Sequence, residues 1–263
     1  MIKDWLHTSN VEKQEESKMR YLGKIYNSNN FGKFCVVEYI NNKNVSVMFL
    51  DTGYVTKTTT KEINNGSIMD RLKPSVHGVG IIGVKYKSKE SCNKTKKEYA
   101  LWNSMLERCY SKTNSEKFVA YNGCSTSENF KRYEFFHEWC QDQVGFKCGY
   151  EIDKDLLIKG NKLYSENTCL FLPREINAAI SLKKSQRSKL LIGVRKRGEH
   201  FSARYSCFNK GVEFGKFSTE MEAFLAYKKA KEDYLKSLAE KYMKSIDYRA
   251  YKALMNYCVE TTD

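Results

Sequence analysis

The chain has 263 residues, of which 41% are hydrophobic, which is enough for two or three small cores. Its 45 Lys and Arg outnumber 31 Asp and Glu, and the resulting formal net charge of +14 favours an anionic partner. No apolar run approaches the ~20 residues of a membrane span, and the charged N-terminus does not resemble a secretory signal, so we expect a cytoplasmic protein without a membrane partner.

The nine cysteines are odd in number, scattered along the chain and never spaced as C-x-x-C. Neither a zinc ribbon nor a disulfide framework is indicated by such a pattern. We therefore interpret them as reduced thiols, most of them buried.

The first part of the chain predicts a polar helix followed by a small β-domain. Residues 1–20 form the helical lead-in. After them, the runs YLGKIY, KFCVVEYI and NVSVMFLDTGYVTKTTTKEI are rich in β-branched and aromatic residues and are split by Asn/Gly turns. This rhythm is typical of a small antiparallel barrel or sandwich. We predict an SH3-like β-barrel, with the whole domain covering residues 1–75.

Pro74 and the glycines after it predict a linker over residues 76–95. Gly78, Gly80 and Gly83 match the G-x-G-x-x-G pattern of dinucleotide sites. The following VKYKSKES is not the apolar opening of a helix, and no acidic residue follows in a second strand about 20 residues on. A flexible hinge is the better interpretation.

A second domain is predicted over residues 96–182. KKEYALWNSMLERCYSK and RYEFFHEWCQD show helical spacing of apolar residues. A strand over Glu151–Ile158, a turn over residues 159–162, a strand over Thr168–Leu172 and a short helix after Pro173 follow. The apolar stripe of the first helix consists of Leu101, Trp102, Met105, Leu106 and Cys109.

The third domain, over residues 183–263, predicts three short strands and two helices. The strands cover Leu191–Lys196, His200–Cys207 and Val212–Phe217. Thr219 and Glu222 form a capping box that starts the first helix, and a last helix covers about Ser245–Cys258. The apolar face of the first helix consists of Phe224, Tyr227, Leu235, Leu238 and Tyr242. The fold class is therefore α+β.

The segment Lys183–Lys216 concentrates the positive charge, with ten Lys or Arg against two acids. Part of it is an arm suited to phosphate contacts, and part lies on predicted strands beside aromatic residues, which together favour a nucleic-acid surface. A solvated basic face on a structural sheet is the alternative. The candidate DNA-binding residues are Lys183, Lys184, Arg187, Lys189, Arg195, Lys196, Arg197, Arg204 and Lys210.

The strands of this segment, together with the helix after them, resemble the Apetala/ERF-type DNA-binding domain over ~50 residues. The matching residues are Gly193-Val194-Arg195, Phe201-Ser202-Ala203, Gly215-Lys216-Phe217-Ser218-Thr219, Glu222-Ala223 and Ala226-Tyr227. The resemblance implies a three-stranded sheet that docks in the major groove of double-stranded DNA. Arg195, Arg197 and Arg204 would then be the sheet arginines, while Phe201 departs from the family by replacing its usual Trp.

The middle domain is similar to phage-encoded HNH-type endonucleases, in which such a module follows a ββα metal finger. EIDKDLLIKGNKLYSENTCLFLP has the layout of the finger's strand, Asn-containing loop and second strand. The resemblance implies a His general base beside metal ligands. Here Lys154 occupies the position of that base, and a protonated Lys is a poor base.

Candidate catalytic residues are His137, Asp153 and Asp155, and candidate Mg²⁺ ligands are Asp153, Asp155, Asn161 and Asn177. Asp153 and Asp155 are expected on one face of a strand. Structural alternatives are carboxylates that cap the Lys159–Lys162 turn or pair with Lys154 and Arg174, a half-buried helix histidine, and a helix-surface amide. Mg²⁺ would be a cofactor only if the nuclease is active.

Three interpretations follow. The first is a phage-type DNA-binding protein, in the host cytoplasm, whose HNH-like centre is degenerate. The second is an active metal-dependent, homing-type HNH endonuclease. The third is an interaction protein that binds RNA or a host or defence protein, for which the N-terminal barrel would be suited.

Overall fold

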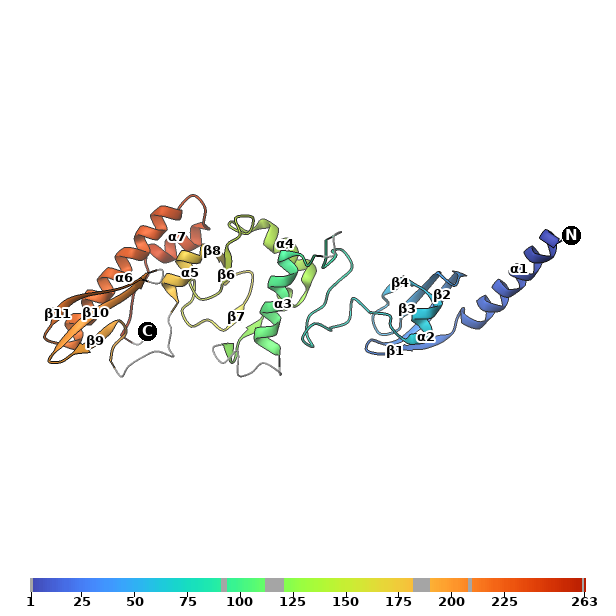
Figure 1. The fold of residues 1–263 in the computed structure, drawn as a ribbon, viewed down its shortest axis with the longest axis horizontal. Coiled ribbons are helices and arrows are strands. Elements are labelled where there is room, and N and C mark those ends of the chain that lie inside the picture. Colours follow the sequence, from blue (N-terminus) through green and yellow to red (C-terminus); the bar gives the residue numbers. More distant parts are fainter. Residues whose placement is uncertain (1, 91–93, 112–120, 182–189, 208–209, 262) are drawn as a thin grey trace. The chain divides into compact units, whose positions relative to one another are not determined.

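The computed structural model describes residues 2–90, 94–111, 121–181, 190–207, 210–261 and 263, without the side chains of residues 2–11, 206, 207, 210 and 211. The chain divides into two compact units, Met1–Thr95 with Arg132–Glu134, and Lys96–Lys131 with Phe135–Asp263 (Figure 1). Both units combine helices with antiparallel sheets. Among the helices that the structure describes, none is long and apolar enough to cross a membrane.

The first unit is a meander of four antiparallel strands with a helix at each end. The strands pair in the order β1-β2-β3-β4, so each lies beside its neighbour in sequence. The elements are α1 (Ile2–Tyr21), β1 (Ile25–Ser28), β2 (Gly32–Asn41), β3 (Asn44–Phe49), β4 (Val55–Thr58) and α2 (Thr60–Asn65).

The predicted SH3-like barrel is wrong: over residues 21–66, all of which the structure describes, the sheet is open and β1 and β4 are its edges. Its core is closed by a helix instead of by a further strand. Ile63 of α2 is buried in one cluster with Phe34, Val47 and Phe49. Ile63 of α2 therefore takes part in the core of an open sheet.

The second unit begins with helices and small strands and ends with a three-stranded sheet and a long helix (Figure 1). Strands β5 and β7 pair in parallel, β6 and β8 pair antiparallel, and the last sheet has the order β11-β10-β9. The elements are α3 (Lys97–Tyr110), β5 (Ser125–Thr126), the 3-10 turn Asn129–Lys131, α4 (Tyr133–Asp142), β6 (Glu151–Asp153), β7 (Leu163–Tyr164), β8 (Leu170–Leu172), α5 (Arg174–Ile180), β9 (Val194–Arg197), β10 (His200–Cys207), β11 (Lys210–Phe217), α6 (Glu220–Tyr242) and α7 (Tyr248–Met255).

The sequence patterns of this unit are largely confirmed. Trp102, Met105 and Leu106 are buried on α3, as the apolar stripe predicted. Thr219 and Glu222 form the predicted capping box of α6. The Thr219 hydroxyl accepts a hydrogen bond from the Glu222 amide, and the Glu222 carboxylate accepts one from the Thr219 amide. The first predicted strand is shorter, however: β6 ends at Asp153 and the chain bends where the pattern predicted continuation to Ile158.

Helix α6 belongs to two hydrophobic cores at once. Its first half packs Phe224 and Tyr227 against the last sheet. Its second half packs Leu235 and Leu238 against α5, α7 and the β6–β8 segment. The predicted boundary at residue 183 lies outside the described residues, but the segments on either side of it share this helix and form one compact unit.

Candidate nucleic-acid interface

The sheet of β9, β10 and β11 has one face covered by α6. Val194 of β9 and Ala203 of β10 are buried in one cluster with Phe224 and Tyr227 of α6. Since successive side chains of a strand point to opposite faces, the residues next to Val194 and Ala203 lie on the other side of the sheet. We call that side the outer face.

The outer face carries four basic side chains and one acid. The antiparallel register places cross-strand partners on the same face of a sheet. Phe217 packs against the cluster on α6, so its neighbour Lys216 lies on the outer face. The pairs on the outer face are His200 with Arg197, Ser202 with Arg195, and Arg204 with Glu213. With Lys216, these seven residues define the outer face, on which Arg195, Arg197, Arg204 and Lys216 supply positive charge.

The structure places the other candidate DNA-binding residues elsewhere. Lys196 is exposed but lies on the α6 side of β9, with its ammonium 6.0 Å from the centre of the Phe201 ring. Lys210 is in β11, although its side chain is not described. The predicted basic arm, made of Lys183, Lys184, Arg187 and Lys189, lies outside the described residues.

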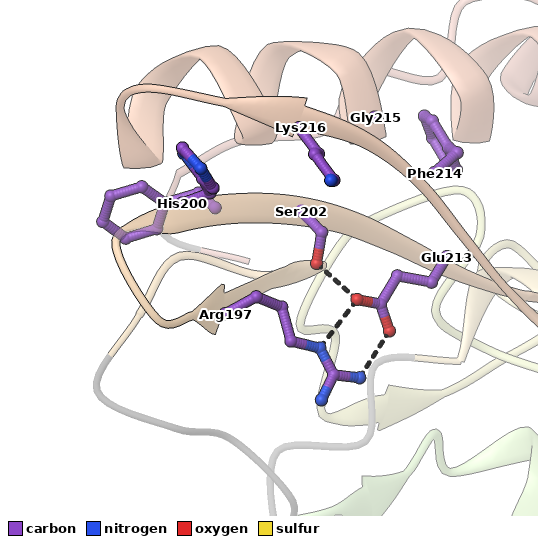
Figure 2. Close-up of a pocket in the computed structure, with 8 residues that line it drawn as sticks. Arg197, His200, Ser202, Glu213, Phe214, Gly215 and Lys216 are labelled. Atoms are coloured by element: carbon purple, nitrogen blue, oxygen red, sulfur yellow. Dashed lines mark hydrogen bonds and ion pairs between the residues drawn. The ribbon is translucent and has the colours of Figure 1, made fainter.

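Arg197, Ser202 and Glu213 form a polar cluster across all three strands (Figure 2). Arg197 donates from Nε to Glu213 Oε1 at 2.9 Å and from Nη2 to Glu213 Oε2 at 2.8 Å. The Ser202 hydroxyl donates to the same Oε1 at 2.7 Å. Sequence reasoning placed Arg197 on the sheet but did not find this partner.

The cluster stays ionised over a wide pH range. Hydrogen bonds from Arg197, then from Ser202, lower the pKa of Glu213 to about 2, and the charge of Arg204 acts in the same direction. The same pairing raises the pKa of Arg197. Both side chains are on the surface, where an ion pair contributes little to the stability of the fold. The main effect of the pair is to orient the Arg197 guanidinium and the Glu213 carboxylate.

A hollow beside this cluster opens on the outer face. It is lined by Arg197, His200, Phe201, Ser202, Glu213, Phe214, Gly215 and Lys216 (Figure 2). The register of β10 against β11 shifts between Phe201 and Ala203, and such a bulge re-aims the side chains around it. Gly215, at φ +73°, passes so close to Phe217 that an added Cβ would lie 2.3 Å from the ring.

The residues that carry the Apetala/ERF resemblance mostly hold the sheet to α6. Gly193 has φ +75°, and a Cβ there would lie 2.2 Å from the Tyr227 ring. Ala203 and Ala223 are fully buried where the two layers meet. These positions therefore account for the sheet-and-helix packing, whereas the arginines of the outer face are free of that constraint.

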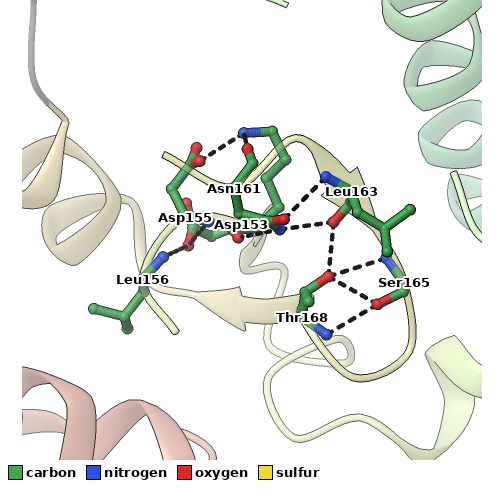
Figure 3. Close-up of polar contacts among 8 residues, drawn as sticks. Asp153, Asp155, Leu156, Asn161, Leu163, Ser165 and Thr168 are labelled. Atoms are coloured by element: carbon green, nitrogen blue, oxygen red, sulfur yellow. Dashed lines mark hydrogen bonds and ion pairs between the residues drawn. The ribbon is translucent and has the colours of Figure 1, made fainter. Parts of the chain in front are cut away.

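The β6–β8 segment does not present a pair of carboxylates on one strand face, so that prediction is wrong. Strand β6 ends at Asp153, and Asp153 Oδ1 accepts hydrogen bonds from the backbone amides of Asp155 at 3.0 Å and Leu156 at 2.8 Å (Figure 3). This turn sends Asp155 away from the strand. Burial raises the pKa of Asp153, against the two backbone bonds that lower it.

Lys154 and Asn161 close the loop that follows. The buried ammonium of Lys154 donates to Asp155 Oδ1 at 2.6 Å and to the Asn161 carbonyl at 2.7 Å. The Asn161 amide donates to the carbonyls of Lys154 and Leu163, and its oxygen accepts from the Leu163 amide at 3.0 Å (Figure 3). The oxygens of Asp155 and Asn161 already accept hydrogen bonds, and the Lys154 ammonium lies between the two residues. The site therefore does not fit Mg²⁺.

The remaining candidates are engaged on other elements. His137 Nδ1 on α4 lies 2.9 Å from Glu98 Oε1 on α3, and both side chains are mostly buried. Asn177 on α5 donates to Glu151 Oε2 at 2.9 Å. Over the described part of the chain, no group of three or more His, Cys, Asp or Glu side chains gathers in a way that could hold a metal ion.

A scan against models of protein families, a search of curated proteins and a search of solved structures each find no match to the chain. The case for function therefore depends on the geometry of the sheet and of the β6–β8 segment.

Proposed function

We propose that this protein binds double-stranded DNA with the outer face of its C-terminal sheet, and that it is a phage-type protein of the HNH/Apetala group whose HNH-like segment is degenerate. The observation that carries the proposal is the gathering of Arg195, Arg197, Arg204 and Lys216 on the one face that α6 leaves uncovered. A strongly basic chain with such a face suits a polyanion.

The dimensions of the sheet suit the major groove. Three strands spaced about 4.8 Å apart span roughly 10 Å between the outer backbones, and the groove of B-DNA is about 12 Å wide. Arg195 and Arg197 lie on the edge strand β9, and Arg204 lies on the central strand β10. All three arginines lie on the face that would enter the groove, where arginine side chains contact both phosphates and base edges.

The HNH-like segment supplies no comparable support for cleavage. Lys154 holds the position of the base, and its ammonium is tied to Asp155 and Asn161. Asp153 accepts hydrogen bonds from the backbone amides of Asp155 and Leu156, a structural role that differs from the expected capping of the Lys159–Lys162 turn. We therefore propose binding and not metal-dependent hydrolysis.

The test is equilibrium binding of the full chain to a labelled duplex, comparing wild type with the double variant Arg195→Ala and Arg204→Ala. Each lost arginine contact costs about 1–3 kcal/mol, so the loss of two should lower affinity at least roughly thirtyfold. The matched control is Lys33→Ala with Lys57→Ala, which removes the same charge from exposed positions of the first sheet.

The proposal predicts little change for the control. Equal weakening by the two double variants would mean that only net charge matters and would contradict a specific surface. Duplex RNA serves as competitor: if it displaces DNA at lower concentration than unlabelled DNA does, the natural partner is RNA and the DNA proposal is overturned.

A further inference from the structure

Glu213 is unexpected on a surface proposed to bind DNA, because a carboxylate repels phosphates. It lies in register opposite Arg204 and forms two hydrogen bonds with Arg197. Its side chain is about one third exposed, at 32%. A surface built only for charge attraction would be served better by a neutral residue there, so the carboxylate calls for another role.

The contact between Glu213 and Arg197 uses one particular edge of the guanidinium. An arginine has five N–H groups in a planar fork. Glu213 occupies Nε and one N–H of Nη2, leaving the edge formed by Nη1 and Nη2. The side chain of Arg197 is 59% exposed, and within the described residues Glu213 is its hydrogen-bond partner. The remaining edge is the one that can donate two parallel hydrogen bonds to a planar acceptor.

The orientation of Glu213 is itself fixed. The Ser202 hydroxyl, buried on the central strand, donates to the same oxygen that accepts from Arg197 Nε. The hydrogen bonds that lower the pKa of Glu213 to about 2 keep the carboxylate charged at any pH used for binding. Arg197 is therefore held as a fixed fork before any ligand arrives, and a preorganised side chain loses less freedom on binding.

We propose that Glu213 is a positioning residue that, with Ser202, aims Arg197 at a base edge and so makes the sheet selective for guanine. Guanine is the base whose O6 and N7 acceptors match the two parallel donors of an arginine in the major groove. This inference depends on the proposed function, since it assigns a base preference to the same outer face.

Glu213 would have two effects on DNA binding: its charge repels phosphates, and its hydrogen bonds position Arg197. Its substitution should therefore change general affinity and guanine preference in opposite directions. Glu213→Gln removes a negative charge, so binding to duplexes of random sequence should stay equal or tighten. The same change weakens the hold on Arg197, so preference for guanine should fall about tenfold, the scale of one good bidentate contact. Glu199→Gln is the matched control, because it removes an exposed acid from the β9–β10 turn of the same sheet.

The experiment selects preferred sites from a random duplex library with the wild-type full chain, then measures binding to a selected duplex and to copies with 7-deazaguanine at each guanine. This base lacks the N7 acceptor. Wild type and Glu199→Gln should lose affinity at one or more positions. Glu213→Gln and Arg197→Lys should show a much smaller loss at those positions, since Lys keeps the charge but not the fork.

The outcomes separate this inference from the proposed function. If wild type does not bind duplex DNA, both fail together. If it binds, but shows no guanine preference or keeps the full 7-deazaguanine effect in Glu213→Gln and Arg197→Lys, the positioning role alone is overturned. Circular dichroism of each variant establishes that the sheet is still folded, which the surface position of both residues leads us to expect.

Discussion

At the scale of single residues, the same amino-acid types have different roles according to what they contact. Asn161 and Asn177 were both candidate metal ligands, yet Asn161 makes three hydrogen bonds inside its loop and Asn177 makes one to a surface carboxylate. Asn161 therefore stabilises the conformation of its loop, and alanine variants of the two residues can be compared directly.

Asn161→Ala should destabilise the protein by about 2 kcal/mol, because three hydrogen bonds are lost and water can replace them only in part. Asn177→Ala should cost no more than about 0.5 kcal/mol, as is usual for a surface position. Urea unfolding followed by tryptophan fluorescence measures both. A cost for Asn161→Ala that appears only with Mg²⁺ present would contradict the structural role and restore the metal site.

Among the residues of the outer face, the arginines could be predicted from the sequence and Glu213 could not. The Apetala/ERF resemblance named Arg195, Arg197 and Arg204 as sheet residues, and all three lie on strands, although the predicted first strand stopped at Lys196 and β9 extends to Arg197. Glu213 escaped notice because its partner Arg197 lies two strands away. The antiparallel pairing of β10 with β11 places Glu213 opposite Arg204, but no local sequence pattern indicates the longer reach of Glu213 to Arg197.

At the scale of elements, the C-terminal sheet depends on a close approach to α6. Gly193 lies against Tyr227 with a left-handed φ of +75°, and Gly198 has a similar φ of +60° with open space around it. The two glycines share the backbone requirement but differ in the space for a side chain.

Gly198→Ala should therefore cost only the left-handed strain, about 1 kcal/mol. Gly193→Ala should cost about 2–5 kcal/mol, since its Cβ also forces Tyr227 aside and overpacks the interface. Urea unfolding of the full chain provides the comparison. Equal costs for the two variants would show that the sheet does not pack on α6 as closely as described.

Helices and strands were predicted correctly where the sequence pattern within the element determines its structure. The predictions were wrong where contacts outside the pattern determine it. Helix α6 followed from its capping box and apolar stripe, which are local. The barrel failed because nothing within β1 to β4 tells whether the edges meet, and the placement of Ile63 from α2 in the core decided it. The strand expected over Glu151–Ile158 ended early because Asp153 captures the amides of Asp155 and Leu156.

At the scale of the whole molecule, charge and architecture combine. The net charge of +14 attracts any polyanion, and α6 joins the basic sheet to the β6–β8 segment in one compact unit. Residues Leu156, Leu170 and Leu172 of the β6–β8 segment pack against the second half of α6, whose first half packs on the sheet. Composition predicts a polyanionic partner, which stays a prediction, while the surface that we propose for it could be located only from the packing of α6 on one face of the sheet.

The most direct test of the central claim is lysine acetylation of the full chain with and without duplex DNA, followed by mass spectrometry. Lys216 on the outer face should be protected, while Lys229, exposed on α6, and Lys57, exposed on the first sheet, should react as in the free protein. Protection of Lys57 or Lys229 with Lys216 unchanged would contradict the account, because DNA would then lie on a different surface.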